Sequence, residues 1–162
     1  MSVCLVEQYT FMSLAGGSTV DFLTKTQAKD IMVRNVVCVH PHTTIKQLSE
    51  ILIENGIGGT PVIDQDRKIV GFVSKTDIVE LDLHSEDYLE SRLEETGGYV
   101  QDIMEPVDTF AYETDSLATI IDKMCTERTH RLLIVNDQEN ISGIITTMDV
   151  MCYLQKMYKS MP

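Results

Sequence analysis

The sequence predicts an α/β fold built from two copies of one β-α-β-β-α unit. Residues 30–78 align with residues 102–150 without a gap, and each aligned pair lies 72 positions apart, as Gly71 and Gly143 do. The agreement in residue type holds along the whole alignment, which indicates a duplicated structural unit. With 162 residues, of which 43% are hydrophobic, the chain can bury a core. A copy of about 50 residues buries little surface by itself, so we expect the copies to share that core.

The first copy is expected to begin with a short strand and a helix. Val36–Val39 is an apolar run that ends before a proline, which is typical of a strand. Thr44 precedes Gln47 by three residues, the spacing of a capping box, and this predicts the start of a helix. Apolar side chains follow at helical spacing until Asn55-Gly56, a left-handed stop signal. These apolar positions are Ile45, Leu48, Ile51 and Leu52.

Two strands and a second helix complete this copy, and the second copy repeats the order. We expect strands at Pro61–Ile63 and Ile69–Val73, joined by a polar turn, and a helix from about Thr76. In the second copy Ser116 is the expected cap of the first helix, and the last helix begins at Met148. The apolar residues of the second copy's first helix are Leu117, Ile120, Ile121 and Met124.

Two segments lie outside the copies. Residues 1–27 match neither copy and form an N-terminal extension, with a short helix expected from Thr19 to about Gln27. Residues 82–99 are rich in Asp and Glu, and we interpret them as a solvated connecting helix. The expected domain organisation is therefore two units, residues 28–81 and residues 100–158, joined by this acidic segment.

The charge balance argues against several classes of function. Lys and Arg number 13 against 25 Asp and Glu, a net charge of −12, so the average field repels phosphate backbones and anionic lipids. We therefore expect neither a nucleic-acid partner nor a membrane partner. No apolar run approaches the roughly 18 residues that span a bilayer, and the first residues lack the basic region of a secretory signal. The four cysteines form no C-x-x-C pair, which favours reduced thiols and a cytoplasmic location.

The most specific motif occurs twice, at equivalent positions. Residues 71–77 (Gly-Phe-Val-Ser-Lys-Thr-Asp) and 143–149 (Gly-Ile-Ile-Thr-Thr-Met-Asp) both run from Gly through strand residues to Ser or Thr and then Asp. Asp-Ile-Met opens both copies, at residues 30–32 and 102–104. These motifs, in this order and repeated, closely resemble CBS domains, the tandem modules named after cystathionine β-synthase. The resemblance covers residues 28–158, about four fifths of the chain.

The residues of this motif suit a nucleotide. Ser74 and Thr146 stand where a strand ends and a helix begins, so that hydroxyl and unpaired backbone N–H groups meet there and attract phosphate. Asp77 and Asp149 follow within one turn, where a carboxylate suits two ribose hydroxyls. The alternative from the residues alone is that Ser or Thr and Asp only cap the helix. The resemblance favours the nucleotide, since CBS proteins commonly bind phosphate and ribose at these positions.

The two copies differ just before their second strand. Copy two has His130-Arg131, which resembles the phosphate-binding pair in the γ subunit of AMP-activated protein kinase. Arg131 can hold phosphate through two hydrogen bonds, and His130 adds a donor near neutral pH; the alternative for Arg131 is a surface ion pair. Copy one has Gly58-Gly59-Thr60-Pro61, which cannot supply that charge, although its glycines permit close backbone approach to an adenine edge.

The resemblance implies that the first strand of each copy flanks the base. The positions concerned are Cys38, where the family often has threonine, and Phe110. Phe110 suits stacking on adenine, while a place in the core is the alternative for a strand phenylalanine. His40 and His42 form the only His-x-His of the chain, and two such residues without a third ligand favour a turn or exposed surface over a zinc site.

The resemblance implies a regulatory module rather than an enzyme, and the chain has no nucleophile elbow, Walker loop or H-E-x-x-H motif. We expect two units packed with pseudo-twofold symmetry that bind AMP, ADP or ATP in the clefts between them, with no cofactor required. We also expect a homodimer that signals occupancy to an effector protein, which the sequence does not identify. The expected nucleotide-binding residues are Cys38, Gly59, Thr60, Pro61, Ser74, Asp77, Phe110, His130, Arg131, Thr146 and Asp149.

Three alternatives stay open at this point. The chain could be an interaction module with empty clefts, which Gly58-Gly59 and Cys38 make plausible for copy one. An S-adenosylmethionine sensor is less favoured, because His130-Arg131 suits a phosphorylated ligand. A small enzyme or metal sensor would use Cys38, His40 and His42. The apolar helix residues that are candidates for the core or for the dimer contact are Leu48, Leu52, Ile120 and Met124.

Overall fold

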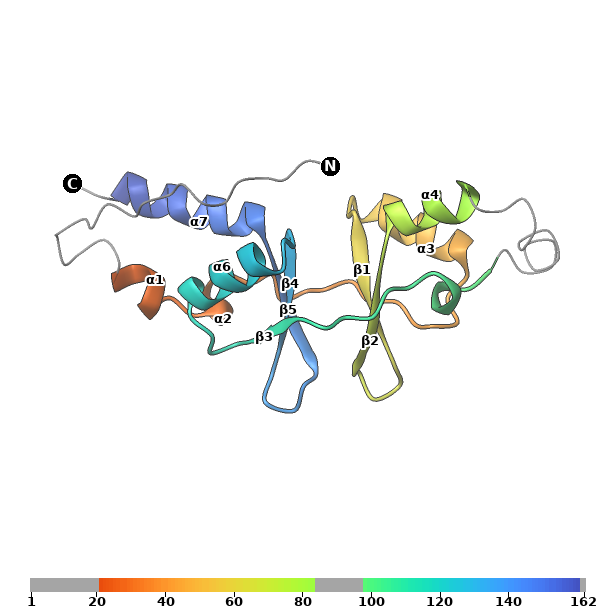
Figure 1. Cartoon of the computed structure of the whole chain (residues 1–162), viewed down its shortest axis with the longest axis horizontal. Coiled ribbons are helices and arrows are strands. Elements are labelled where there is room, and N and C mark those ends of the chain that lie inside the picture. The colour runs from red at the N-terminus through yellow and green to blue at the C-terminus, as the bar shows by residue number, and fades with distance from the viewer. Residues whose placement is uncertain (1–20, 84–97, 161–162) are drawn as a thin grey trace.

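The computed structural model describes residues 21–83 and 98–160, which form two α/β units side by side, with strands in the centre and helices toward the ends (Figure 1). The elements before residue 84 are α1 (Asp21–Lys25), α2 (Ala28–Ile31), α3 (Ile45–Glu54), β1 (Gly59–Ile63), β2 (Ile69–Ser74) and α4 (Lys75–Leu83). The elements after residue 97 are the 3-10 helix η1 (Val100–Asp102), β3 (Phe110–Tyr112), α6 (Leu117–Thr126), β4 (Arg131–Val135), β5 (Ile141–Thr146) and α7 (Thr147–Ser160).

The first long helix of each repeat begins at its predicted cap. The Thr44 hydroxyl accepts a hydrogen bond from Gln47 N at 3.2 Å, and Gln47 Oε1 accepts one from Thr44 N at 3.1 Å, so the capping box ahead of α3 is complete. The Ser116 hydroxyl accepts a hydrogen bond from Thr119 N at 3.2 Å at the start of α6. Gly56 follows α3 with a φ of +63°, a left-handed conformation that glycine adopts without strain. These predictions are confirmed.

Each unit contains an antiparallel hairpin, β1–β2 in the first and β4–β5 in the second, and β3 adds a strand parallel to β4. The strand expected at Val36–Val39 is wrong in extent, because only Val39 pairs there, as an isolated parallel bridge to Val62. The Val37 carbonyl instead accepts a hydrogen bond of 2.5 Å from the Thr60 hydroxyl. This side-chain bond and the two main-chain bonds of Val39, to Pro61 and Ile63, hold the segment against β1, where the second unit has a continuous ladder.

The first residues of each repeat pack on the core of the other repeat. Ala28 and Met32 are buried in a cluster with residues of α6, β4, β5 and α7, and Figure 1 shows α2 beside those elements. Conversely, Val100 is buried among residues of α3, β1 and β2, with Met104 packed against them. A β-carbon on Gly143 would lie 2.5 Å from the Met32 sulfur, so the absence of a side chain at Gly143 allows Met32 to pack against β5. Neither core is complete without residues of the other repeat.

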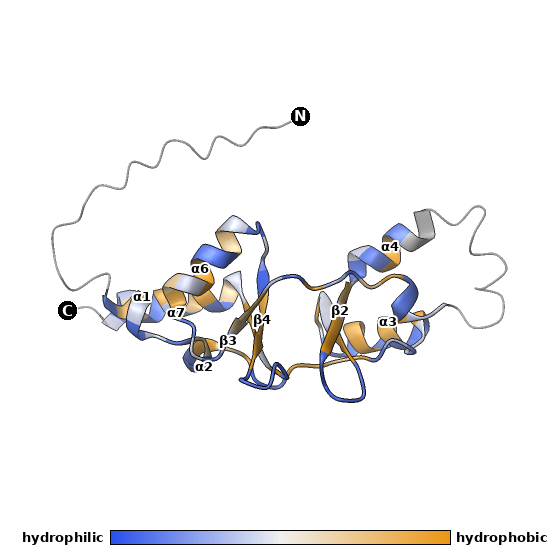
Figure 2. Ribbon diagram, turned by 60° about the horizontal axis from the view of Figure 1, so that its bottom comes forward, coloured by the Kyte–Doolittle hydropathy of each residue, from blue (hydrophilic) through white to orange (hydrophobic). Residues whose placement is uncertain are grey.

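A third apolar cluster joins the units and confirms that the copies share a core. Its buried members are Ile63, Leu133 and Ile141. Side chains of β2, β3 and β5 pack around them, and Figure 2 shows the strands of both units as largely hydrophobic. Main-chain hydrogen bonds of 2.8–3.0 Å also cross between the repeats, two between Val33 and Ile144 and two between Phe72 and Glu105. The two units therefore form one packed body.

Several further predictions concern single regions. The helix residues that were candidates for core or dimer contact are all buried in the cores: Leu48, Leu52, Ile120 and Met124. Helix α1 lies within the short helix expected at residues 19–27. Most of the expected connecting helix, residues 84–97, and the first 20 residues of the extension lie outside the described residues. No helix within residues 21–83 and 98–160 is long and apolar enough to cross a membrane.

Candidate functional site

Two clefts lie between the repeats at equivalent positions. The Asp149 cleft, about 330 Å³ in volume, is lined among others by Val36, Val37, Gly58, Gly59, Thr146 and Asp149. The Glu105 cleft, about 320 Å³, is lined among others by Glu105, Val107, Asp108, Thr109, Glu127 and Thr129. The offset of 72 positions relates them, since Val37 and Gly59 of one cleft correspond to Thr109 and Arg131 of the other. The duplication of the sequence therefore produces a pair of related clefts.

The two clefts differ in charge. Valine, isoleucine, proline and glycine make up most of the Asp149 cleft, with Asn35, Arg131, Thr146 and Asp149 as its polar residues. The Glu105 cleft is lined by three carboxylates, those of Glu105, Asp108 and Glu127, and by the guanidinium of Arg131. An apolar cleft with a few convergent polar groups is the usual form of a small-molecule site. The Asp149 cleft is therefore the candidate site.

Thr146 and Asp149 meet at the start of α7. Asp149 Oδ2 accepts hydrogen bonds from Thr146 N at 2.7 Å and from Thr146 Oγ1 at 2.6 Å, and Thr146 Oγ1 accepts one from Asp149 N at 3.3 Å. The pair thus caps the helix, as the alternative from the sequence states. The same pair lines the Asp149 cleft, so the cap and the cleft wall are one structure.

The first copy of the motif is placed differently. Ser74 N donates a hydrogen bond to Asp77 Oδ2 at 2.7 Å at the start of α4, the counterpart of the bond from Thr146 N to Asp149 Oδ2. Neither residue lines the Asp149 cleft or the Glu105 cleft. The repeats also differ at one pair of equivalent positions. Gly59 adds no side chain to its cleft, whereas its counterpart Arg131 adds a long side chain. Of the two motif copies, only the second contributes its Thr and Asp to either cleft.

Arg131 stands on the boundary between the clefts, because it lines both. Its guanidinium carbon lies 4.3 Å from the centre of the Phe72 ring, and Phe72 lines both clefts too. A β-carbon on Gly59 would lie 2.6 Å from Phe72 Cε1 and 3.0 Å from Arg131 Nη1, so Gly59 makes room for this pair. Among the described residues, the partner of the Arg131 side chain is an aromatic ring and not a carboxylate.

The neighbours of Arg131 and Gly59 take other roles. His130 is exposed and lines neither cleft, and its carbonyl oxygen accepts a hydrogen bond of 3.0 Å from Thr147 N at the start of α7. Thr60 is fully buried and its hydroxyl is bonded to the Val37 carbonyl, so it supports the cleft wall from behind. Pro61 lines the Asp149 cleft directly. Of this group, only Pro61 belongs to the cleft surface.

Cys38 and Phe110 belong to the apolar cluster between the units and line neither cleft. The residues before them, Val37 and Thr109, take the lining positions. Burial raises the pKa of the Cys38 thiol, an effect that the charge of Arg67 only partly offsets. Cys38 is therefore a protonated, weakly nucleophilic thiol at neutral pH.

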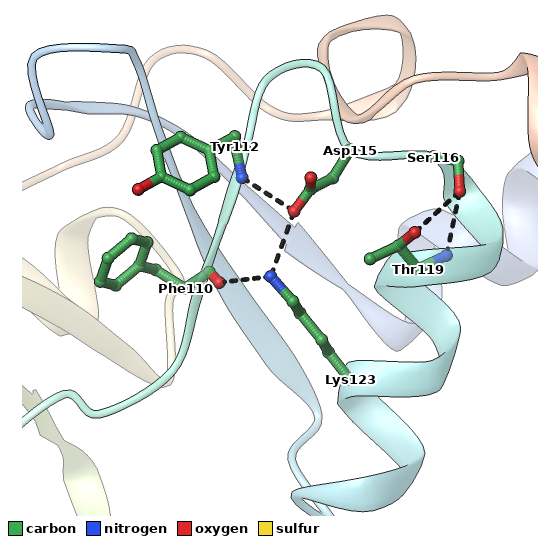
Figure 3. Close-up of polar contacts among 6 residues, drawn as sticks. All are labelled: Phe110, Tyr112, Asp115, Ser116, Thr119 and Lys123. Atoms are coloured by element: carbon green, nitrogen blue, oxygen red, sulfur yellow. Dashed lines mark hydrogen bonds and ion pairs between the residues drawn. The ribbon is translucent and has the colours of Figure 1, made fainter.

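A polar cluster fixes the backbone of Phe110. Lys123 Nζ of α6 donates a hydrogen bond to the Phe110 carbonyl at 3.0 Å and pairs with Asp115 Oδ2 at 3.1 Å, as Figure 3 shows. The same carboxylate oxygen accepts a hydrogen bond of 3.1 Å from Tyr112 N. These contacts tie α6 to β3 and hold the strand that leads from the Glu105 cleft into the second unit.

His40 and His42 have separate partners. His40 Nδ1 donates a hydrogen bond to the Ile63 carbonyl at 2.9 Å, and the His42 ring meets Tyr99 edge-on with 6.3 Å between ring centres. Within residues 21–83 and 98–160, no three His, Cys, Asp or Glu side chains are grouped so that they could hold a metal ion.

Sequence reasoning missed Phe72, Val37 and Thr109 as lining residues. Phe72 stands inside the repeated motif, but there it reads as an ordinary strand residue. Nothing in the local pattern indicates that it meets Arg131, because the contact joins strands of different repeats. Sequence reasoning placed the clefts between the units but did not predict which residues of the two copies meet there. The Asp149 cleft combines Gly58 and Gly59 of copy one with residues of copy two.

Comparison with known proteins agrees with this architecture. The family model for the CBS domain matches the chain twice, over residues 28–84 and 100–156. The chain belongs to the CBS domain family. Its two CBS domains form a tandem pair with the α/β fold that solved CBS domain pairs have.

Two solved structures and one curated relative illustrate the likeness. CBSX2 of Arabidopsis thaliana in complex with AMP is 26% identical, with a TM-score of 0.71 over 82% of this chain and 98% of that chain. The CBS domain pair of protein MJ0100, solved with 5′-methylthioadenosine and S-adenosyl-L-methionine, shares the fold at 22% identity and a TM-score of 0.69, covering 82% of this chain and 98% of that chain. The chloroplastic CBS domain-containing protein CBSX1 of Arabidopsis thaliana is 31% identical over 150 residues, 80% of this chain and 61% of that protein. This chain spans less than two thirds of the first curated relatives, with shares of 36%, 23% and 61%.

Proposed function

We propose that this CBS pair is a regulatory, non-catalytic module that binds AMP, ADP or ATP in the Asp149 cleft and signals its occupancy to a partner protein. The observation that carries the proposal is the convergence of Thr146, Asp149 and Arg131 on one mainly apolar cleft. The complex of the related CBSX2 with AMP supports an adenine nucleotide as the ligand.

Each part of the cleft has a role in this proposal. The apolar walls at Val37 and Ile57 suit the faces of the adenine ring, since burying apolar surface there is favourable. Arg131 and the N-terminus of α7 suit the phosphate, through charge-assisted hydrogen bonds and the helix dipole. The Asp149 carboxylate suits the ribose hydroxyls.

Helix capping by Asp149 is compatible with binding of the ribose. Both hydrogen bonds from Thr146 end on Asp149 Oδ2. A carboxylate has about four acceptor sites on its two oxygens. Among the described residues, Asp149 Oδ1 has no such bond, and we assign it to the ribose hydroxyls. The capping bonds would hold the carboxylate in place for this contact.

The proposal includes a homodimer in the cytoplasm, an effector protein that is still to be found and no required cofactor. Occupancy can change the effector only if the nucleotide binds one shape of the module more tightly than another. The Glu105 cleft is poorly suited to a phosphate, because Glu105, Asp108 and Glu127 would repel it. The Asp149 cleft is therefore the site on which the tests should focus.

A thermal-shift panel on the purified chain tests the ligand class. AMP, ADP, ATP, GTP and S-adenosylmethionine are compared, each with and without magnesium. A ligand at about a hundred times its dissociation constant adds roughly 2.7 kcal/mol to the unfolding free energy. For a domain of this size, that raises the melting temperature by about 5–10 °C. We expect an adenine nucleotide to give this shift and GTP to give none.

A matched pair of variants locates the site. Asp149→Asn should remove most of the nucleotide-dependent shift, because it weakens the contact to the ribose. Asp77→Asn changes the equivalent cap outside both clefts and should leave the shift intact. A flat panel at millimolar ligand contradicts the proposal and favours an interaction module with empty clefts. A shift with S-adenosylmethionine alone assigns the cleft to that ligand instead.

A further inference from the structure

Among the described residues that line the two clefts, Arg131 is the one cation, and it lines both of them. The chain has 13 Lys and Arg residues in all, but the remaining described ones lie elsewhere. An anion bound in either cleft would therefore depend on the same guanidinium. The two clefts therefore share one cationic side chain, which lies at their boundary.

The position of that guanidinium is set by Phe72 and Gly59. The guanidinium lies over the Phe72 ring, with 4.3 Å between its carbon and the ring centre. Gly59 leaves the space that the pair needs, since a β-carbon there would lie 2.6 Å from Phe72 Cε1. A guanidinium carries five N–H donors, and contact with a ring uses none of them in a conventional hydrogen bond, so Arg131 can turn toward an anion in either cleft. Without a ligand, Arg131 therefore contacts Phe72 at the boundary between the two clefts.

We propose that Arg131 and Phe72 make the two clefts mutually exclusive for anionic ligands, so that one chain binds one nucleotide at a time. This inference rests on the proposed nucleotide function. A phosphate in the Asp149 cleft draws Arg131 toward it and leaves the carboxylates of Glu105, Asp108 and Glu127 as the charged groups of the Glu105 cleft. Those carboxylates repel a second anion across a short distance, where charges are weakly screened.

The same arrangement couples the clefts in both directions. An anion that entered the Glu105 cleft would remove Arg131 from the Asp149 cleft, and by thermodynamic linkage each ligand weakens the other by the same factor. The chain can therefore report a single occupied state even though it carries two related clefts. Phe72 acts as a positioning residue here, because it holds the guanidinium at the boundary without a required contact to the ligand.

Calorimetric titration of the chain with AMP gives the first readout, the number of nucleotides per chain. We expect one equivalent for the natural sequence. The triple variant Glu105→Gln, Asp108→Asn, Glu127→Gln removes the repulsion, and we expect a second equivalent at least tenfold weaker than the first, because Arg131 is already engaged. Two equal and independent equivalents in the natural chain would overturn the inference while leaving the nucleotide function intact.

The Arg131 side-chain N–H signal in nitrogen-15 NMR gives the second readout. The Phe72 ring current should shift this signal in the free chain, and Phe72→Leu should abolish that shift. Saturation with AMP should move the natural signal toward its position in Phe72→Leu, since the guanidinium leaves the ring. A signal that stays unmoved while AMP is bound would overturn the inference. Absence of any AMP binding would overturn both the inference and the function on which it rests.

Two substitutions of arginine separate this role from a general charge effect. Arg131→Gln should weaken AMP binding at least tenfold, and in the triple variant it should remove the dependence of the second equivalent on the first. Arg67→Gln removes the same charge from the exposed turn between β1 and β2, outside both clefts, and should change neither the affinity nor the number of equivalents. An equal effect of both substitutions would show that net charge, and not the shared guanidinium, limits binding.

Discussion

At the scale of single residues, the two repeats place different amino acids at the same left-handed backbone position after their first long helix. The residue that ends the first long helix in the left-handed region is Gly56 in one repeat, with φ +63°, and Arg128 in the other, with φ +51°. A side chain in this conformation costs about 1–2 kcal/mol, which glycine avoids apart from its larger loss of entropy on folding. Arg128 is therefore a position of local strain.

Arg128→Gly should raise the unfolding free energy by about 0.5–1 kcal/mol, since relief of strain exceeds the added entropy cost. Urea denaturation followed by circular dichroism measures the change. The reciprocal variant Gly56→Arg should lower the unfolding free energy by a similar amount. A loss of stability in Arg128→Gly would mean that the side chain makes contacts worth more than the strain.

At the scale of elements, the opening segment of each repeat packs on the core of the other repeat. Ala28 of helix α2 and Met32, the residue that follows this helix, pack on the second unit, and η1 packs on the first through Val100. Met32 is only 8% exposed, so truncation leaves a cavity in the second core. Damage to the opening segment of one repeat should therefore appear in the other repeat.

Met32→Ala should lower the unfolding free energy by about 2–4 kcal/mol. Hydrogen exchange should show faster exchange of amides in β5 and α7, the elements that Met32 contacts, before those in β1 and β2. Met104→Ala serves as the mirror experiment, with the effect expected in β1 and β2. Faster amide exchange in the repeat that carries the substitution, and not in the other repeat, would contradict this packing of opening segments across the repeats in solution.

At the scale of the whole molecule, the exchanged segments and the cluster around Ile63, Leu133 and Ile141 make the two units interdependent. The chain should therefore unfold in one cooperative step, although its sequence contains two repeats. The same interlocking places both clefts at the boundary between the units, where Arg131 lines both of them.

Urea unfolding of the chain should give superimposable curves by far-ultraviolet circular dichroism and by fluorescence of its tyrosines. A fragment of residues 98–162 lacks α2 and should not fold, whereas the same fragment supplied with a peptide of residues 21–39 should gain helical signal. Two separate transitions in the intact chain, or a fragment that folds alone, would contradict the interdependence of the units.

The sequence by itself determined the local structure of this protein and its family. The capping box at Thr44, the cap at Ser116, the turns and the constant offset of 72 positions depend on residues a few positions apart or on direct comparison of the copies. Such signals act through nearby backbone atoms, so Thr44 and Ser116 begin their helices as predicted. The motif with Thr146 and Asp149 was found for the same reason, since both residues belong to one strand-to-helix junction.

Only the tertiary structure decided which residues meet across the repeats. It placed Gly59 of copy one with Asp149 of copy two, packed the partly buried Cys38 and Phe110 against the apolar cluster between the units, and brought Arg131 onto Phe72. It also reduced the strand expected at Val36–Val39 to one bridge. These contacts join positions that are distant along the chain, and they are selected by the packing of whole elements. Local pattern carries no information about that selection, because the same strand residue can face its own repeat or the other one.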